Sequence, residues 1–382
     1  MLKSQLPAAL VATAPRATKT ARPRRTNVRR RGRTAVIWAL VCFGLLQLAY
    51  YPASDYWPRI RDVEYGDKLA NLREQLADKP KNQPCVVMFG SSLTGWAFNP
   101  SELETVRPGI PGQPVVFNFA MNSGGVFIEL VCLRRLLATG IRPDLVIVET
   151  HPQFLFRAFN TVPGEHYWQV WRYQRQDLEL LRRYDPKYPE FRPEWKQFQE
   201  FPWYTQRHEF QNYVVPRWGR RIGQTDALWT ANDRNGWEFI PSAIAHGDKH
   251  TRQQIIDSIR PRIQGLSQRL RTEEVFKQMY REIIETCQRE GIAVVMVRMP
   301  EASYALEEYS PALRQELAEF YDEIEQKYNV PFIDASAWVD DDGFPDGFHL
   351  RPSGAAVFMK RLERELLGAF LADRSLPAVK PH

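Results

Sequence analysis

Cysteine is scarce in this chain of 382 residues, and the few thiols form no recognisable metal site. No two of them have zinc-finger spacing, and no other metal-binding pattern is evident, so we expect no bound metal. One lies in an apolar run near the N-terminus, and we expect the others to be buried thiols. A translocated domain could alternatively form one disulfide. The cysteines are Cys42, Cys85, Cys132 and Cys287.

Acidic residues are absent from residues 1–33, which contain ten Lys or Arg. The whole chain has a formal net charge of +6, so the rest carries about −4 and is mildly acidic. A basic tail can bind nucleic acid, but nothing in the acidic remainder supports that function. We expect a basic tail and no nucleic-acid partner. The basic residues are Lys3, Arg16, Lys19, Arg22, Arg24, Arg25, Arg29, Arg30, Arg31 and Arg33.

Charge is also absent from residues 34–51, an apolar run broken only by Gln47. Its length is near the lower limit of about 17–25 residues for a helix that crosses a bilayer. Because the Arg-rich tail precedes this run, the positive-inside rule places 1–33 in the cytoplasm and the remainder outside it. A cleaved signal peptide is the alternative, but its charged start is usually much shorter. We therefore expect a single-pass inner-membrane protein with a periplasmic or extracellular domain.

Internal repeats and low-complexity tracts are absent beyond the tail. Residues 52–81 are polar and partly helical, and we interpret them as a stalk leading into a domain at 82–382. Five nearly continuous apolar runs there are typical of strands buried on both faces of a parallel sheet. Helical patterns separate them, which predicts a three-layer, doubly wound α/β fold. The expected strands are Val86–Phe89, Val115–Phe119, Leu145–Val148, Ala293–Val297 and Pro331–Ile333. The expected helices are Val126–Ala138, Thr272–Glu290, Pro311–Lys327 and one starting near Pro352.

A stretch at about 154–241 has no clear period and holds seven of the eleven Trp. It has too many aromatics to be disordered, so we interpret it as an insertion between the third and fourth strands. Aromatic side chains most often fill a core or a lid. Contact with a glycan or with a membrane surface are the alternatives. The seven are Trp168, Trp171, Trp195, Trp203, Trp218, Trp229 and Trp237.

Two short motifs could carry chemistry. The first strand ends in Phe89-Gly90-Ser91-Ser92-Leu93, which puts a serine at the strand end where α/β folds place their sites. Near the C-terminus, Asp346 precedes His349 by three residues. A serine needs a base to remove its proton, and the base needs an acid that fixes its tautomer. Each motif alone is a common loop pattern, but together they predict a Ser-His-Asp triad.

The pair of motifs resembles the SGNH/GDSL hydrolases, which carry a Gly-Asp-Ser-Leu-like block after the first strand and an Asp-x-x-His block before the last helix. Alignment on Leu93 places the family's nucleophile at Ser92 and puts Ser91 where the family has Asp. The second serine resembles the membrane-anchored branch that includes the D-alanyl transfer protein DltD and related surface-polymer enzymes. The resemblance implies Ser92, His349 and Asp346 as catalytic residues.

The resemblance also implies an oxyanion hole, whose donors stabilise the charge that develops in acyl transfer. The family's glycine block corresponds to Asn118–Gly125, which places one backbone donor at Gly124, with Gly125 nearly as suitable. The N–H of Ser92 supplies another. The family usually has an Asn side-chain donor after the third strand. Here His151 stands at that place and could donate instead, and a structural His at a strand end is the alternative.

The implied enzyme handles O-acyl groups, of the acetyl type, on a cell-envelope or exported polysaccharide through an acyl-enzyme. Water as acceptor makes it an esterase, and a sugar hydroxyl makes it an acyltransferase. The mechanism needs no cofactor. The anchor favours a place beside a membrane acyltransferase or export complex. The competing hypothesis is a non-catalytic SGNH-fold scaffold or glycan-binding subunit of an envelope assembly.

Overall fold

The computed structural model describes residues 25–105, 113–156, 168–200, 207, 232–238, 253–258, 260–261 and 271–379. The chain divides into two units, Met1–Ala49 and Tyr50–His382. The second unit contains the sheet, and we call it the body.

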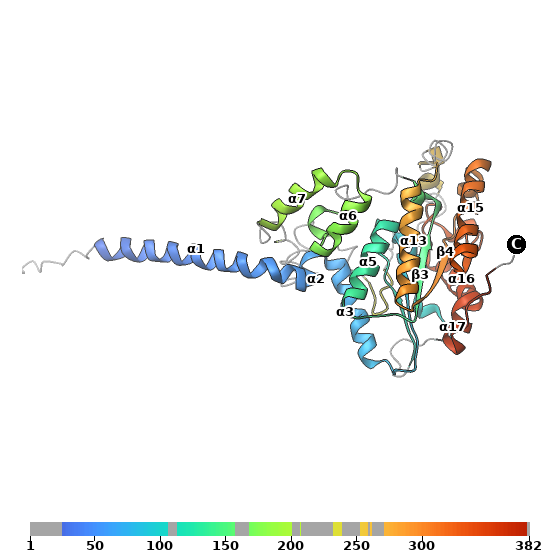
Figure 1. The fold of residues 1–382 in the computed structure, drawn as a ribbon, viewed down its shortest axis with the longest axis horizontal. Helices are drawn as coiled ribbons and strands as arrows, with labels where there is room; N and C mark the ends of the chain where they lie inside the picture. The colour runs from blue at the N-terminus through green and yellow to red at the C-terminus, as the bar shows by residue number, and fades with distance from the viewer. Residues whose placement is uncertain are drawn as a thin grey trace, which may run out of the picture. The chain divides into compact units, whose positions relative to one another are not determined.

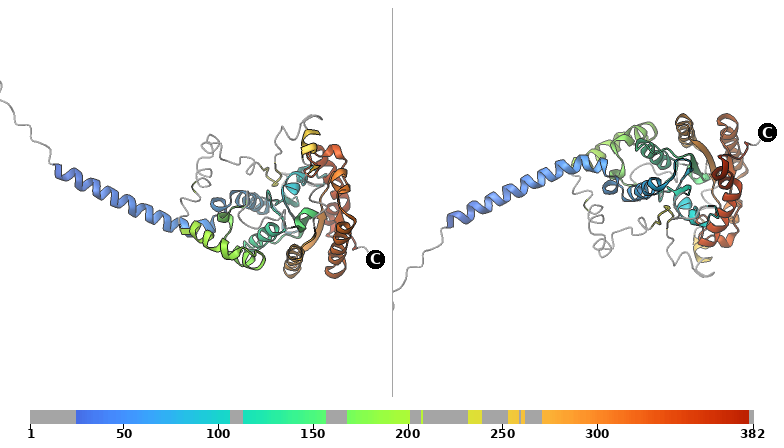
Figure 2. Two further views of the ribbon diagram at one scale, coloured as in Figure 1. Left: turned by 90° about the horizontal axis from the view of Figure 1, so that it is seen from above. Right: turned by 90° about the horizontal axis from the view of Figure 1, so that it is seen from below.

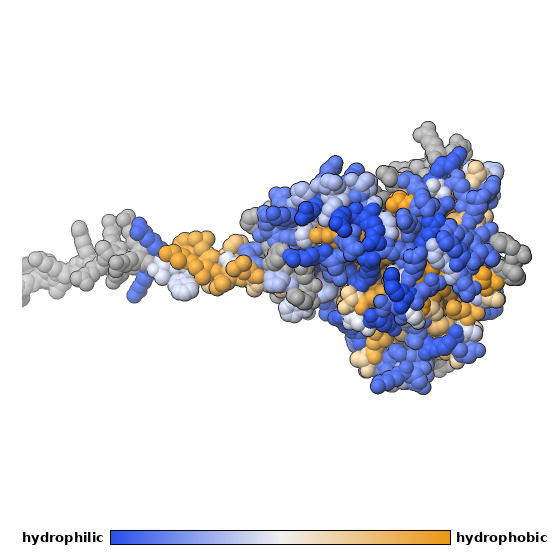
Figure 3. Space-filling view, viewed as in Figure 1, coloured by the Kyte–Doolittle hydropathy of each residue, from blue (hydrophilic) through white to orange (hydrophobic). Residues whose placement is uncertain are grey.

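The first unit contains most of helix α1 (Arg25–Tyr56). The stretch Arg31–Tyr50 is long and apolar enough to cross a membrane, by length and composition. Its large side chains are exposed, with Leu40 at 66% and Leu48 at 72%, and they form a hydrophobic surface in Figure 3. A membrane anchor and a signal sequence both have this character.

The body is built on a five-stranded parallel sheet, which confirms the predicted fold class. The strand order is β2-β1-β3-β4-β5, with every neighbouring pair parallel. The first strand, β1, lies inside the sheet, and β2 forms one edge beside it. The chain then crosses to the other side of β1 and adds β3, β4 and β5 in turn. The winding reverses between β1 and β3, and α/β sheets bind ligands at the carboxyl ends of strands at such a point. The strands are β1 (Cys85–Phe89), β2 (Val115–Asn118), β3 (Leu145–Thr150), β4 (Ala293–Arg298) and β5 (Phe332–Asp334).

Helices cover both faces of the sheet and complete three layers (Figure 1). Successive strand residues alternate between two cores, so Val87 packs with one set of helices and Val86 with the other. The first set is α3 (Val63–Asp78), α5 (Val126–Ala138), α13 (Glu274–Arg289) and α15 (Pro311–Tyr328). The second is α4 (Ser92–Ala97), α16 (Pro352–Leu362) and α17 (Gly368–Asp373), with a π-helical turn at Glu363–Leu367. Smaller helices are α2 (Pro58–Arg61), α6 (Leu178–Tyr184), α7 (Tyr188–Glu200) and α14 (Ser303–Glu307).

The segment 52–81, expected to be a stalk, packs as part of the body. Helix α3 buries Leu69 and Leu72 in the same core as α5. Its cap residue Asp62 is fully buried and pairs with Arg135 of α5 at 3.1 Å. The segment looks polar because several of its charged residues are buried in ion pairs, a feature that composition alone does not show.

Residues 168–200 of the insertion pack against α5. Helices α6 and α7 lie on the α5 side of the body in Figures 1 and 2, and Asp177 binds Arg135 at 2.6 Å. Trp168 and Trp195 are buried in the core that α5 shares with the sheet. These two side chains therefore fill a core rather than contact a glycan or a membrane surface. Trp203, Trp218 and Trp229 lie outside the described residues.

Candidate active site

The turn that carries Ser92 lies at the carboxyl end of β1. Helix α4 begins at Ser92, and the Ser91 hydroxyl accepts a hydrogen bond from the N–H of Leu93 at 3.1 Å. Ser91 is thus the N-cap of this helix. The N–H of Ser92 forms no hydrogen bond within the described part of the chain, as is usual for the first residue of a helix.

The structure brings Ser92, His349 and Asp346 together. Oγ of Ser92 lies 2.8 Å from Nε2 of His349, and Nδ1 of the same ring lies 2.7 Å from Oδ2 of Asp346. Oδ1 of Asp346 accepts from the N–H groups of Phe348 and His349 at 3.1 and 2.9 Å, which shapes the loop. The His349 side chain is 25% exposed, so solvent reaches it. Asp346 holds a proton on Nδ1 and leaves Nε2 to accept one from Ser92.

Nearby carboxylates make His349 a stronger base. Burial alone would lower the pKa of His349, but hydrogen-bonded Asp346, together with Glu149 and Glu238, raises it above its ordinary value of 6.5. Burial would raise the pKa of Asp346, and the facing His349 reverses this effect and lowers it. Both shifts favour the charged imidazolium–carboxylate pair.

The loop after β2 differs from the expected oxyanion loop. Ser123 has a positive φ of 51°, and the tight turn directs the N–H of Gly124 to the carbonyl oxygen of Met121 at 2.8 Å. The N–H of Gly124 is thus used within the loop. The N–H of the next residue, Gly125, forms no hydrogen bond within the described residues. Gly125 is thus the better-placed donor of the two glycines.

His151, expected as a third donor, is fully buried with both ring nitrogens facing protein groups. Nδ1 accepts from the N–H of Gln153 at 3.3 Å, and Nε2 lies 3.4 Å from Oε2 of Glu301. Burial raises the pKa of Glu301, but His151 and Arg298 outweigh burial and lower it to about 2. Nε2 forms no hydrogen bond within the described residues, and it has no exposed surface through which to reach a substrate. The geometry favours the structural alternative for His151.

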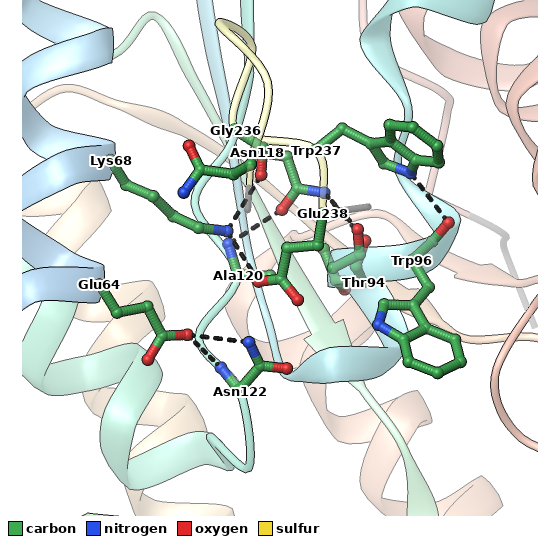
Figure 4. Close-up of polar contacts among 12 residues, drawn as sticks. Glu64, Lys68, Thr94, Trp96, Asn118, Ala120, Asn122, Gly236, Trp237 and Glu238 are labelled. Carbon is green, nitrogen blue, oxygen red and sulfur yellow. Dashed lines mark hydrogen bonds and ion pairs between the residues drawn. The ribbon is translucent and has the colours of Figure 1, made fainter. Parts of the chain in front are cut away.

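Residues 232–238, a returning part of the insertion, lie beside Thr94 and Trp96 of α4, the helix that begins at Ser92 (Figure 4). The indole N–H of Trp237 donates to the carbonyl oxygen of Trp96 at 3.1 Å. The Trp96 ring packs against the His349 imidazole, with ring centroids 4.5 Å apart. The insertion thus supports the helix that begins at Ser92 and, through Trp96, the His349 ring.

A buried ion pair fixes the same segment to α3. Nζ of Lys68 donates to Oε1 of Glu238 and to the carbonyl oxygen of Gly236, both at 3.0 Å (Figure 4). The two charged side chains are 0% and 5% exposed. One turn away, Glu64 accepts from the backbone N–H and the side-chain amide of Asn122 at 2.6 and 3.2 Å. Helix α3 therefore holds both the insertion and the loop after β2, which motif analysis did not predict.

Comparisons with known proteins are limited in extent. Residues 37–218 match the family DUF1574, described as "Protein of unknown function". That range includes Ser92 but neither Asp346 nor His349. No curated protein matches the chain. Similar solved structures include one of a "putative acylhydrolase" from Bacteroides fragilis NCTC 9343. It is 12% identical, with a TM-score of 0.34, and the match covers 78% of this chain and 95% of that one.

Metal-binding clusters of three or more His, Cys, Asp or Glu are absent from the described residues. All four cysteines are free, and three are buried. Burial raises the pKa of Cys85 and of Cys287 to about 12, and it raises that of Cys132 as well. These three are therefore protonated packing residues rather than nucleophiles.

Proposed function

We propose that this protein is a serine hydrolase or O-acyltransferase with Ser92 as its nucleophile. The observation that carries the proposal is the hydrogen-bonded series from Ser92 through His349 to Asp346, with distances of 2.8 and 2.7 Å. A weakly acidic hydroxyl becomes a nucleophile when a base lies within hydrogen-bond reach and a third group orients that base. The site also lies at the strand ends where α/β folds bind ligands.

The geometry supports a two-step acyl transfer. Oγ of Ser92 attacks the carbonyl carbon of an ester while its proton passes to Nε2 of His349. The bond from that carbon to the alcohol oxygen breaks, and the leaving oxygen takes the proton from Nε2. Water or a second hydroxyl then attacks the acyl-enzyme, gives its proton to His349 and releases Ser92, which regains that proton. Asp346 stays ionised and holds Nδ1–H throughout.

Two backbone groups are our candidates for stabilising the tetrahedral oxyanion. They are the N–H of Ser92 and the N–H of Gly125, the second replacing Gly124 in the predicted set. Both lack a hydrogen-bond partner within the described residues, as a donor reserved for substrate would. A single donor of this kind is worth about 10²–10³ in rate.

The substrate class we propose is an O-acyl ester, of the acetyl type, on a cell-envelope or exported polysaccharide. The support is the resemblance of the two motifs to the membrane-anchored SGNH branch, together with an N-terminal helix apolar enough to cross a membrane. On this proposal the helix anchors the body outside the cytoplasm, beside an acyltransferase or export complex. The chemistry requires neither a cofactor nor nucleic acid.

A non-catalytic scaffold or glycan-binding subunit is the second candidate. The full burial of His151 and the hydrogen bond from the Gly124 N–H to Met121 favour it, because neither of these two expected oxyanion donors is open to a substrate. The intact hydrogen-bonded triad favours the enzyme.

Covalent labelling separates the two candidates. A fluorophosphonate probe should label the full-length protein in detergent, and Ser92→Ala should abolish the label. Ser91→Ala should keep it while losing about 0.5–2 kcal/mol of stability, because Ser91 caps α4. A folded wild-type protein that resists the probe, or a Ser92→Ala variant that still reacts, would favour the scaffold.

A further inference from the structure

Glu149, near the end of β3, is a fully buried carboxylate that binds the nucleophile turn from behind. Its oxygens accept from the N–H and the hydroxyl of Ser91 at 2.8 and 2.7 Å. They also accept from the N–H and the hydroxyl of Thr94 at 3.1 and 2.5 Å. Ser91 and Thr94 flank Ser92 in the chain, so one side chain holds the turn on both sides of the nucleophile.

The turn is shaped around this carboxylate. A Cβ at Gly90 would lie 2.3 Å from Oε2 of Glu149 and 2.3 Å from Oγ1 of Thr94, so a larger residue would displace the contact. Within the described residues, Glu149 forms no ion pair with a Lys, Arg or His. A buried carboxylate without a cation is costly, and a neutral residue would usually serve stability better. The retained charge therefore points to a role in the site.

Two ionisable groups that interact with Glu149, one on α5 and one on α13, are neutral. Glu129 of α5 is fully buried, and its carboxyl oxygens have no hydrogen-bond partner within the described residues. Burial, reinforced by Glu149, raises the pKa of Glu129 well above its ordinary value. Burial likewise raises the pKa of Tyr280 of α13, with smaller contributions from both glutamates. Glu129 and Tyr280 therefore stay protonated. Glu149 accepts four hydrogen bonds from Ser91 and Thr94 and donates none, as an ionised carboxylate does.

Three carboxylates raise the pKa of His349. They are Asp346 from its own loop, Glu238 from the returning insertion segment and Glu149 from β3. Glu238 is already paired with Lys68, and Asp346 is hydrogen-bonded to the imidazole. Glu149 is the member of the three that touches the nucleophile turn and has no cation beside it.

We propose that Glu149 is a positioning residue of this site, which fixes the turn around Ser92 and places a negative charge behind the Ser92–His349 pair. That charge favours the imidazolium formed when Ser92 gives up its proton, in the same sense as Asp346 does. The inference rests on the proposed serine chemistry.

The test is the pH dependence of aryl acetate hydrolysis by the full-length protein in detergent. Glu149→Gln removes the charge and should move the midpoint of the pH–rate limb to lower pH, because Glu149 raises the pKa of His349. Its plateau rate should fall about 10–100-fold as the turn loses register. Glu149→Asp keeps the charge on a shorter side chain, so its plateau should fall with a smaller midpoint shift. Glu129→Gln is the matched control, because it replaces a neutral carboxyl, and it should change neither the plateau rate nor the midpoint.

A Glu149→Gln plateau that falls with an unmoved midpoint would reduce Glu149 to a structural residue and overturn the inference. If Glu149→Gln does not fold, Thr94→Val takes its place, since it removes one hydrogen bond and keeps the charge. Thr94→Val should lower the plateau at an unchanged midpoint, and a wild-type plateau would refute the positioning role. Activity that survives Ser92→Ala would instead refute the proposed function, whatever the Glu149 variants do.

Discussion

Oγ of Ser92 lies 2.8 Å from Nε2 of His349, although 257 residues separate the two in the chain. Strand β1 presents the serine at its carboxyl end, and the loop before α16 presents the histidine. The distance between them is therefore set by the assembled sheet and its helices rather than by either loop alone. Each side chain itself is only partly buried, so replacing it should change the chemistry far more than the fold.

Asp346→Asn should lower the turnover rate by orders of magnitude, on the scale of about 10⁴ known for the Ser-His-Asp template. The amide removes the charge that stabilises the imidazolium and favours the wrong tautomer of His349. His349→Ala should be similarly damaging, and adding Ser92→Ala should cost little more, because the triad acts as one unit. Steady-state kinetics on the three variants checks this, with thermal melting as the control for folding. Additive losses in the double variant would contradict a shared mechanism.

Activity should rise with pH through a single limb centred above 6.5, the ordinary pKa of His349. A general base accepts a proton only when it is neutral. Because the pKa of His349 is raised, the activity should be lost as the pH falls through that raised pKa, which lies above 6.5. Asp346→Asn removes the principal group that raises it, so any residual activity should have its limb at lower pH. Initial rates of aryl acetate hydrolysis from about pH 5 to 9 measure both limbs. A wild-type limb below 6.5 would show that another group acts as base.

Much of the fold was predictable from local patterns in the sequence. The helix Val126–Ala138 has the predicted bounds. Both ends of each of the five strands lie within two residues of the ends predicted from the apolar runs. A strand buried on both faces must be apolar throughout, so its pattern is visible without knowledge of its partners. The spacing of Asp346 and His349 was likewise local, and the two side chains do meet.

Contacts between distant charged residues could not be predicted in this way. Lys68 and Glu238 are 170 residues apart and follow no motif. Glu149 is a single acidic residue at a strand end, and no motif in the sequence links it to Ser91 or Thr94. One hint was available in α3, because Lys68 follows Tyr65 at helical spacing and so falls on the apolar face. A Lys on that face has to be paired, but the sequence does not name its partner.

The proposed topology predicts where a C-terminal reporter works. A reporter active only outside the cytoplasm should be active when fused after His382, because the Arg-rich residues before the apolar run favour the cytoplasm. Deleting residues 34–51 should silence it, which serves as the control. The mature protein should also run on a gel at the size of the uncleaved chain, since an anchor is not removed. A reporter that works only in the cytoplasm would reverse the orientation, and a shortened product would indicate a signal peptide.

Lys68→Met should destabilise the body by about 3–5 kcal/mol, because it leaves the Glu238 carboxylate buried without its cation. Adding Glu238→Gln should recover part of the loss, since no unpaired charge then remains. Arg142→Gln is the matched control, because Arg142 pairs with Glu290 at the surface and should cost less than about 1 kcal/mol.

Urea unfolding midpoints of the full-length variants in detergent rank these effects. The same Lys68→Met variant should lose activity before it unfolds, because Glu238 belongs to the segment whose Trp237 supports Trp96 against His349. A Lys68→Met variant no less stable than Arg142→Gln would show that the pair is not buried in solution. A double variant less stable than Lys68→Met would show that Glu238 has another partner besides Lys68.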